Sequence, residues 1–184
     1  MKKAIFIDKD GTLIRDVPYN VQPHLVVLEQ GVIQGLQLLS RAGYLIVIIS
    51  NQSGVARGYF EEPALVQVKE TITELLKKEG IVLDGFYYCP HHPAGKVAPY
   101  AVDCSCRKPA PGMILEAARE LKVDTRTSWM IGDILHDVEA GNRAGCRTVL
   151  INNGNETEWI GGAWRKPDFI TAGVWEAADL ICKS

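Results

Sequence analysis

A short apolar run that stops at two carboxylates constrains this chain most. Residues 4–7 (AIFI) have the composition of a buried strand, and Asp8, Lys9, Asp10 and Gly11 follow directly. The period of two in a strand predicts both carboxylates on one side and Lys9 on the other, with Gly11 turning the backbone away. Such carboxylates need a cation or a proton, which predicts a hard metal beside a carboxylate nucleophile and a carboxylate acid/base. The alternative is a solvated Asp-Gly turn.

Segments with strand and helix patterns alternate along the whole chain. Short β-branched runs predict strands, and apolar residues at helical spacing predict helices between them. The expected strands are residues 4–7, 44–49, 86–88, 128–131, 148–151 and 168–170, and the expected helices are residues 31–42, 61–79, 112–121, 138–144 and 174–181, with a loop at 15–30. The alternation predicts an α/β fold with a doubly wound parallel sheet, in a single domain over residues 1–184.

Length, charge and hydropathy exclude several functional classes. The 184 residues suit one core, and a net charge of −2 offers no basic surface to a nucleic acid. No apolar run is long enough for a membrane span, and residues 4–7 are too short for a signal peptide, so we expect a soluble, cytoplasmic, monomeric protein. The chain has neither a GxGxxG nor a GxxxxGK[ST] motif, which removes dinucleotide and P-loop sites.

Polar residues at the ends of the expected strands carry the candidate chemistry. Asp8, Ser50 and Asp133 each follow a strand, and in a parallel α/β sheet these ends meet at one edge, where ligands bind. Acids hold Mg²⁺, and hydroxyl, lysine and backbone N–H groups hold phosphoryl oxygens, so the edge suits phosphoryl transfer. The residues that could act there are Asp8, Asp10, Asp133, Asp137, Ser50, Asn51, Arg107 and Lys108. Taken singly, Ser50 could cap a turn, Lys108 could be a surface lysine and Asp137 a helix N-cap.

Three of the five cysteines lie within residues 89–106, which favours a metal site over a disulfide framework. Four nitrogen and sulfur ligands suit tetrahedral zinc, and a bound zinc would order the loop between the ligands, which has no apolar core. Spacing alone does not choose between His91 and His92. The alternative is reduced cysteines that only pack, as we expect for Cys146 and Cys182. The candidate ligands are Cys89, His91, His92, Cys104 and Cys106.

Four segments in order resemble a known family. DKDGTL (residues 8–13), Ser50, Lys108 and GDILHD (residues 132–137) are similar to the motifs of the haloacid dehalogenase-like phosphatases. The resemblance implies that Asp8 attacks phosphorus to form an aspartyl-phosphate and that Asp10 is the general acid and base. It further implies that Mg²⁺ is bound by Asp8, the Asp10 backbone carbonyl and Asp133, and that Ser50 and Lys108 hold the phosphoryl oxygens.

Two further segments resemble one branch of that family, the D-glycero-D-manno-heptose 1,7-bisphosphate 7-phosphatases. They are SNQSGVARG (residues 50–58) and CPHHPAG…CSCRKP (residues 89–109). The resemblance implies that Gln52 and Arg57 meet sugar hydroxyls or a second phosphate, although Arg57 could also be a solvated loop charge. It implies a structural zinc within a zinc loop at residues 89–107, with the basic pair Arg107 and Lys108 at its end, and zinc ligands Cys89, His91, Cys104 and Cys106.

The reaction implied by this branch is removal of the C7 phosphate from a small sugar bisphosphate, a step toward nucleotide-activated heptose. The short segment between Asp10 and Ser50 leaves no room for a cap domain, so we expect a rather open site. The chain departs from the branch at Ile134, where members often carry lysine. Two alternatives remain: the same chemistry on histidinol phosphate or another phosphomonoester, and an inactive zinc-loop binding module.

Overall fold

The computed structural model describes residues 1–184 and contains one parallel sheet of six strands. The spatial order is β3-β2-β1-β4-β5-β6, so the chain builds outward from β1 in one direction and then returns to β4 on its other side. A ligand site is expected at this switch point, between β1 and β4. The strands are β1 (Lys3–Ile7), β2 (Tyr44–Asn51), β3 (Gly85–Cys89), β4 (Trp129–Gly132), β5 (Arg147–Ile151) and β6 (Phe169–Thr171).

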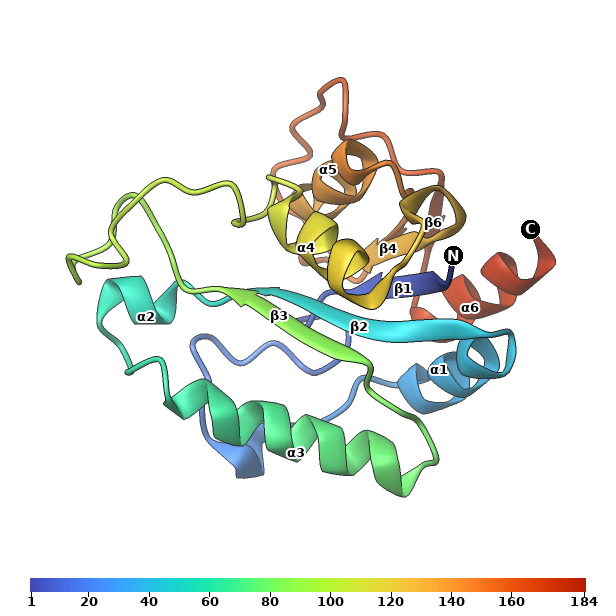
Figure 1. The fold of residues 1–184 in the computed structure, drawn as a ribbon, viewed down its shortest axis with the longest axis horizontal. Coiled ribbons are helices and arrows are strands. Elements are labelled where there is room, and N and C mark those ends of the chain that lie inside the picture. The colour runs from blue at the N-terminus through green and yellow to red at the C-terminus, as the bar shows by residue number, and fades with distance from the viewer.

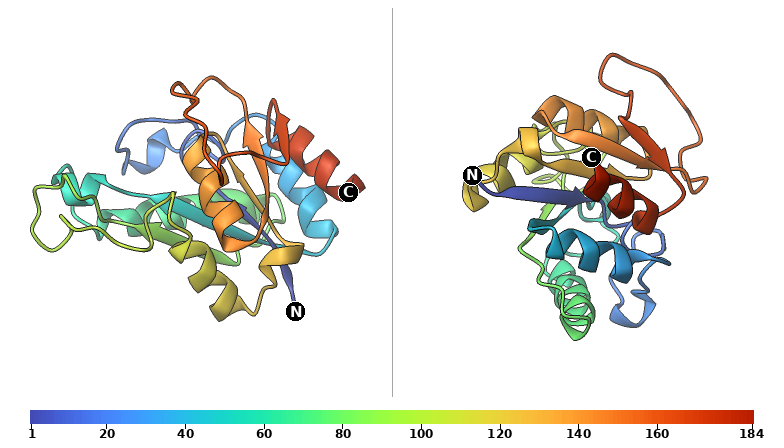
Figure 2. Two further views of the ribbon diagram at one scale, coloured as in Figure 1. Left: turned by 90° about the horizontal axis from the view of Figure 1, so that it is seen from above. Right: turned by 90° about the vertical axis from the view of Figure 1, so that its right-hand side faces the viewer.

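Helices cover both faces of the sheet, which makes three layers (Figures 1 and 2). On one face lie α1 (Val32–Arg41), α3 (Ala64–Lys78) and α6 (Val174–Lys183), and on the other lie α4 (Gly112–Leu121) and α5 (Leu135–Ala144). The remaining helical pieces are short: α2 (Gly54–Arg57) and the 3₁₀ turns η1 (Pro23–Leu25) and η2 (Thr125–Thr127). The predicted doubly wound α/β fold is therefore confirmed.

The alternation of side chains along each strand produces the two cores. In β1, Ile5 and Ile7 pack with α1, α3 and α6, whereas Ala4 and Phe6 pack with α4 and α5. All four residues are fully buried, as expected for a parallel strand covered on both faces. Packing on both faces therefore holds β1 rigidly, and this limits the movement of the residues that directly follow it.

Most predicted elements agree with the structure to within a few residues, and the differences have local causes. Strand β2 continues through Ser50 and Asn51, because these residues pair with Tyr88 and Cys89 of β3. Helix α5 begins at Leu135, three residues before the prediction, and the four-residue α2 was not predicted. The segment at residues 15–30 is a loop as predicted, apart from η1.

The arrangement of β1 after Ile7 differs from the prediction. The strand ends at Ile7, so strand alternation no longer governs the next three residues, and the prediction that Lys9 points away from the carboxylates is wrong. The Lys9 ammonium lies 2.5 Å from an oxygen of Asp10. Gly11 does turn the backbone as predicted, with a φ of 82°.

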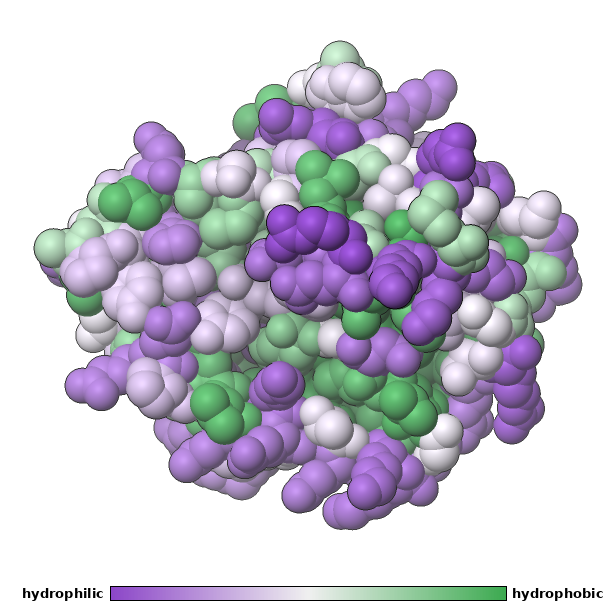
Figure 3. Space-filling view, in the orientation of Figure 1, coloured by the Kyte–Doolittle hydropathy of each residue, from purple (hydrophilic) through white to green (hydrophobic).

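Long loops lie at the edge of the sheet formed by the strand ends. Between β1 and β2 the chain forms only a loop, η1 and α1, so no cap domain is inserted there. The loop at residues 89–107, where zinc is predicted, projects beside α2 at the left of Figure 1, and the loop between β5 and β6 passes over α5. In the space-filling view, hydrophobic residues lie in small groups among hydrophilic ones (Figure 3). No helix has the length and apolar character needed to cross a membrane.

Candidate active site

Three carboxylates converge where β1 and β4 end side by side. Asp8 follows β1, Asp133 follows β4, and Asp137 lies in the first turn of α5. Their ligand oxygens all lie within 4.8 Å of one another, and all three residues are buried. The Asp8 backbone N–H donates to the carbonyl of Ile131 on β4 at 2.9 Å, which continues the pairing of the two strands. The sequence therefore predicted correctly that strand ends bring Asp8 and Asp133 together.

Lys108 enters this acidic cluster as a buried counter-ion. Its ammonium lies 2.6 Å from Asp137 Oδ1, donates to Asp8 Oδ1, and donates to the carbonyl of Ile49 at 3.0 Å. Burial by itself would lower the pKa of Lys108, but the carboxylates of Asp137 and Asp8 outweigh it and raise that pKa. The prediction left open whether Lys108 is a surface lysine, and the structure excludes this because the residue is 3% exposed.

The charges in the cluster do not balance without a further cation. Three carboxylates surround one ammonium, and burial raises the pKa of Asp8 well above its usual value. Burial, followed by repulsion from Asp137, raises the pKa of Asp133 to about 6. A divalent cation would supply the two missing positive charges, and carboxylate oxygens are the ligands that Mg²⁺ prefers. The donor set therefore fits Mg²⁺.

Both carboxylate oxygens of Asp137 already have partners within the protein, so Asp137 does not need a metal ion. Its Oδ2 accepts a hydrogen bond from the backbone N–H of Ile134 at 3.2 Å, at the start of α5, while its Oδ1 faces Lys108. The possibility that Asp137 is the N-cap residue is wrong, because Asp137 occupies the third helical position and Ile134 is the N-cap. Asp8 and Asp133 are therefore the carboxylates of this cluster that remain candidates for metal ligands.

Two residues absent from the sequence prediction hold Asp133. The Asn155 side-chain amide donates to Asp133 Oδ2 at 2.6 Å, and the Thr12 hydroxyl donates to Oδ1 at 3.2 Å. A Cβ on Gly11 would collide with both Asp133 and Asn155, so only glycine fits there. Asn155 follows β5, and the rule that selected polar residues after strand ends would have found it if it had been applied to that strand.

The Asp10 carboxylate lies outside the acidic cluster, although the sequence pattern predicted that it shares a side with Asp8. Its two oxygens accept hydrogen bonds from the Lys9 ammonium at 2.5 Å and from the Gln52 amide at 3.0 Å. The same Gln52 nitrogen lies 2.7 Å from the hydroxyl of Ser50, which is fully buried. Gln52 thus links Asp10 to the end of β2.

The side chain of Asn51 holds the backbone of Lys108 in place through two hydrogen bonds. Its Oδ1 accepts from the Lys108 N–H, and its amide donates to the Lys108 carbonyl, both at 3.0 Å. These two hydrogen bonds use the side chain as a clamp, which a sequence pattern cannot reveal because 57 positions separate the partners. Asn51 also lines the cleft beside Asp10, and its predicted contact with substrate stays a prediction.

A second cluster forms at the end of β3. The ligand atoms of Cys89, His91, Cys104 and Cys106 lie within 4.8 Å of one another, and the cysteines are free. The sulfur–sulfur distances are 3.2–3.5 Å, and His91 Nδ1 lies 3.6 Å from Cys89 and 3.5 Å from Cys106. A tetrahedron with Zn–S bonds of about 2.3 Å has edges of about 3.8 Å, so the cluster fits zinc.

The structure separates the two histidines that the sequence left equivalent. His91 points into the sulfur cluster, whereas His92 Nε2 lies 3.1 Å from a guanidinium nitrogen of Arg57 and its Nδ1 accepts from Ala94 N–H. Burial, followed by the charges of Arg107 and Arg57, lowers the pKa of His92. Arg107 donates to the His91 carbonyl at 3.3 Å. Arg57 and Arg107 therefore both contact the loop between Cys89 and Cys106.

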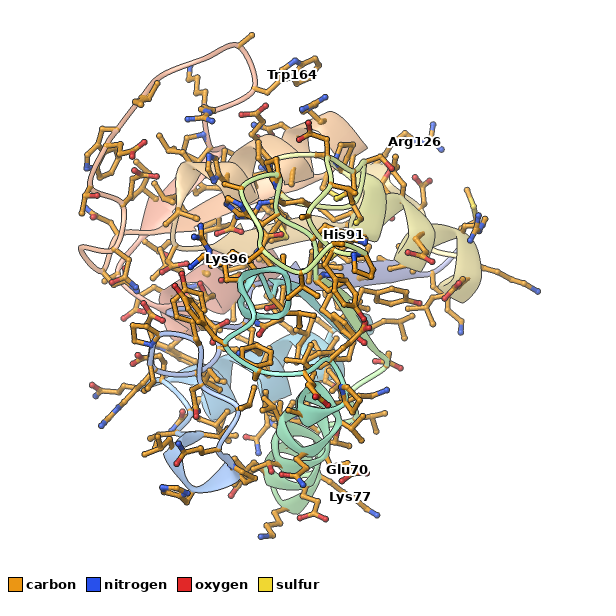
Figure 4. All side chains as sticks on the ribbon, turned by 90° about the vertical axis from the view of Figure 1, so that its left-hand side faces the viewer. Glu70, Lys77, His91, Lys96, Arg126 and Trp164 are labelled. Atoms are coloured by element: carbon orange, nitrogen blue, oxygen red, sulfur yellow. The ribbon has the colours of Figure 1, made fainter.

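A polar cleft of about 270 Å³ opens beside Asp10. Figure 4 looks onto this end of the molecule, with the zinc loop carrying His91 and Lys96 in front of the sheet, Trp164 on the loop above and Glu70 on α3 below. The cleft is lined by Lys9, Asp10, Asp16, Pro18, Tyr19, Asn20, Asn51, Gln52, Ser53 and Gly54.

Comparison with known proteins shows the family. Residues 105–177 match the family model of HAD-hydrolase-like proteins. The chain is 48% identical over 155 residues to the D-glycero-β-D-manno-heptose-1,7-bisphosphate 7-phosphatase of Pasteurella multocida, covering 84% of each chain. The enzyme of the same name from Haemophilus ducreyi is 44% identical over 185 residues, which cover 100% of this chain and 94% of the relative. The chain belongs to this branch of the haloacid dehalogenase-like phosphatases.

A solved structure of the same phosphatase branch was determined with magnesium and phosphate bound. The D,D-heptose 1,7-bisphosphate phosphatase of B. bronchiseptica, complexed with magnesium and phosphate, superposes with a TM-score of 0.85 at 31% identity and covers 98% of both chains. The chain therefore shares the fold of a phosphatase that binds Mg²⁺ and phosphate, which agrees with the charge imbalance of its own acidic cluster.

Proposed function

We propose that this phosphatase removes the C7 phosphate of D-glycero-β-D-manno-heptose 1,7-bisphosphate. The observation that carries the proposal is the buried cluster at the switch point of the sheet, where Asp8 lies between Lys108 and a second acid, Asp133. The named activity of relatives at 44–48% identity supplies the substrate. The absence of an inserted cap leaves the cleft open enough for a sugar with a phosphate at each end.

In the proposed reaction, an Asp8 oxygen attacks phosphorus and the bond to the sugar oxygen breaks. Asp10 gives a proton to that leaving oxygen, and then takes a proton from the water that hydrolyses the aspartyl-phosphate. Each Asp10 oxygen accepts one hydrogen bond from a nitrogen donor, which leaves a second lone pair on each oxygen to carry the proton.

The proposed Mg²⁺ ligands are the carboxylates of Asp8 and Asp133 and the backbone carbonyl of Asp10. When bound, Mg²⁺ neutralises the charge of the acids and of the phosphoryl oxygens. Asn155 and Thr12 orient Asp133 toward this position, and Lys108 holds Asp8. The Lys108 ammonium and the Ser50 hydroxyl are the proposed partners of the phosphoryl oxygens.

Arg57 and Arg107 are the proposed partners of the second phosphate of the substrate. Arg57 and Arg107 are held by the zinc loop through His92 and the His91 carbonyl, and the Arg57 Nε is buried without a partner. A buried donor without a partner is costly, which favours an anionic ligand close to Arg57. Gln52 is the proposed partner of a sugar hydroxyl. The proposed zinc, on Cys89, His91, Cys104 and Cys106, keeps Arg107 and Lys108 in place.

A substrate panel tests the proposal. Purified protein with Mg²⁺ is given the β and α anomers of the heptose bisphosphate, histidinol phosphate and glycerol 3-phosphate, and released phosphate is measured. We expect the highest kcat/KM for the β-heptose bisphosphate and loss of activity with a magnesium chelator. Equal or better turnover of histidinol phosphate would refute the substrate, and no turnover of any compound would favour an inactive binding module. We further propose a cytoplasmic monomer, since the substrate is a soluble metabolite; sedimentation tests the monomer.

A further inference from the structure

One carboxylate ties the edge strand of the sheet to the loop at residues 89–107. Glu62 lies just before α3, and its Oε1 accepts a hydrogen bond from the Tyr88 hydroxyl at 2.9 Å. Its Oε2 accepts from the Tyr100 hydroxyl at 2.6 Å. Tyr88 belongs to β3, whereas Tyr100 lies in the outer half of the loop. These three side chains, called the latch below, therefore join three separate segments of the chain.

Both tyrosines of the latch keep their protons and act as donors. Burial, followed by the hydrogen bond to Glu62, raises the pKa of Tyr88 to about 12. The hydrogen bond to Glu62, followed by burial, raises the pKa of Tyr100 as well. Glu62 therefore accepts through both of its oxygens, and hydrogen bonds to an ionised acceptor are stronger than those between neutral groups.

Tyr100 connects the latch to both histidines of the loop. Its ring faces that of His91, with 6.2 Å between the centroids. Its carbonyl accepts from the His92 N–H at 3.0 Å, and the His92 side chain lies 3.1 Å from a guanidinium nitrogen of Arg57. The position of Arg57 is therefore linked to that of Glu62 through His92 and Tyr100.

The outer half of the loop is also docked on α2. The carbonyl of Ala56, in α2, accepts from the N–H groups of Lys96 and Val97 at 2.7 and 3.0 Å. Gly95 approaches so closely that a Cβ there would lie 2.8 Å from this carbonyl oxygen, so a side chain would push the loop away. None of these backbone contacts involves a predicted zinc ligand. The outer half of the loop therefore has an anchor of its own, which consists of α2 and Glu62.

We propose that Glu62 is a positioning residue, which together with Tyr88 and Tyr100 holds the outer half of the loop on α2. Through Tyr100 and His92, the latch keeps Arg57 in place for the second phosphate. Its effect on kinetics rests on the proposed function, whereas the latch itself does not. Since Arg57 would bind only the second phosphate, loss of Glu62 should weaken the binding of a bisphosphate and leave the chemistry at the acidic cluster unchanged.

Kinetics of latch variants test the positioning role. We expect Glu62→Ala to raise KM for the heptose bisphosphate about tenfold, because two hydrogen bonds to a charged group are lost, with kcat and the activity on glycerol 3-phosphate unchanged. Glu62→Gln should raise KM by no more than about threefold, since its amide keeps one carbonyl acceptor. Tyr100→Phe should raise KM about as much as Glu62→Ala, because only Tyr100 leads to His92.

Trypsin cleavage measures the latch without any substrate. Lys96 is exposed on the loop in front of the sheet (Figure 4), so a released loop offers the bond after Lys96 to trypsin. Cleavage there, followed by mass spectrometry, should be about tenfold faster in Glu62→Ala than in the wild-type protein, because cleavage follows the population of the open loop.

Glu120→Ala is the matched control. Glu120 accepts from the Tyr87 hydroxyl at 2.7 Å, so it too joins a helix to β3, but Tyr87 packs with α4 on the other face of the sheet. Neither KM nor the cleavage rate at Lys96 should change in this variant.

Each outcome decides for or against the latch. Equal cleavage of the wild-type protein and Glu62→Ala overturns it, whatever the substrate is. Faster cleavage with an unchanged KM for the bisphosphate overturns the positioning of Arg57. A loss of kcat on both substrates also overturns it, because that result places the effect of Glu62 in the chemistry. Wild-type protein without activity on the heptose bisphosphate overturns the proposed function, while the cleavage rates still decide the latch. Thermal unfolding of every variant checks that the fold is retained.

Discussion

The ion pair between Asp137 and Lys108 permits a quantitative test of the buried cluster. The Asp137 side chain is 0% exposed and that of Lys108 is 3% exposed, with 2.6 Å between the charged atoms. Removing one partner of a buried ion pair costs about 3–5 kcal/mol. In Asp137→Asn, Lys108 keeps Asp8 as a counter-ion and the new amide oxygen can still accept from Ile134 N–H. We therefore expect a smaller loss, about 2–3 kcal/mol.

This loss should be visible in thermal unfolding. For a chain of this size, 1 kcal/mol shifts Tm by about 2–4 °C, so the expected fall in Tm for Asp137→Asn is roughly 4–12 °C, measured by circular dichroism with magnesium chelated. Activity should fall as well, by roughly tenfold to 100-fold in kcat/KM, because Lys108 loses one of the two carboxylates that position its ammonium.

The matched control is Asp179→Asn. Asp179 also has an ammonium at 2.6 Å, from Lys183, but the two side chains are 44% and 72% exposed. An exposed pair of this kind contributes less than about 0.5 kcal/mol, so Tm should change by no more than about 2 °C. Equal Tm changes for the two variants would refute the argument, because burial would then make no difference to the pair.

Four further predictions follow from the site. Asp8→Asn should abolish phosphate release yet keep or raise Tm, since burial already disfavours the carboxylate; retained turnover would contradict Asp8 as the nucleophile. Asn155→Ala should weaken Mg²⁺ binding about tenfold in calorimetry, through Asp133. Without metal, the wild-type protein should have its largest stability advantage over Asp133→Asn below about pH 4. It should lose that advantage as the pH rises through about 6, because folding raises the pKa of Asp133 from 3.8 to about 6. The difference in Tm between the two proteins measures this. Thiol titration should find Cys182 reactive at once and three more thiols after zinc chelation, with Cys146 protected by burial, which raises its pKa to about 12.

The sequence was informative about the fold because each segment carries its own periodicity. The fully buried β1 could be recognised from four apolar residues, and the amphipathic helices from their apolar spacing. The start of α5 was predicted too late, although the buried Leu135 lies at helical spacing from Val138. The helix forms there since Asp137 satisfies the backbone N–H of Ile134, a contact between a side chain and the helix end that periodicity does not report.

The candidate site was predictable only where it lies on strand ends. Asp8 and Asp133 could be brought together because parallel topology places the ends of strands at one edge. The clamp of Asn51 on Lys108 and the amide of Asn155 on Asp133 depend on how loops return to that edge. Loop conformation is set by many contacts distant in sequence, so these partners became visible only in the folded chain.

The attachment of the zinc loop has an evolutionary consequence. Its first residue, Cys89, pairs in register with Asn51, and the side chain of the same Asn51 holds the backbone of Lys108, just past its last residue. Both ends of the zinc loop are thus held by one residue of β2, Asn51. Insertions or deletions between the two ends of the loop would leave these contacts of Asn51 intact, so lineages can change the length of this rim without rebuilding the catalytic apparatus.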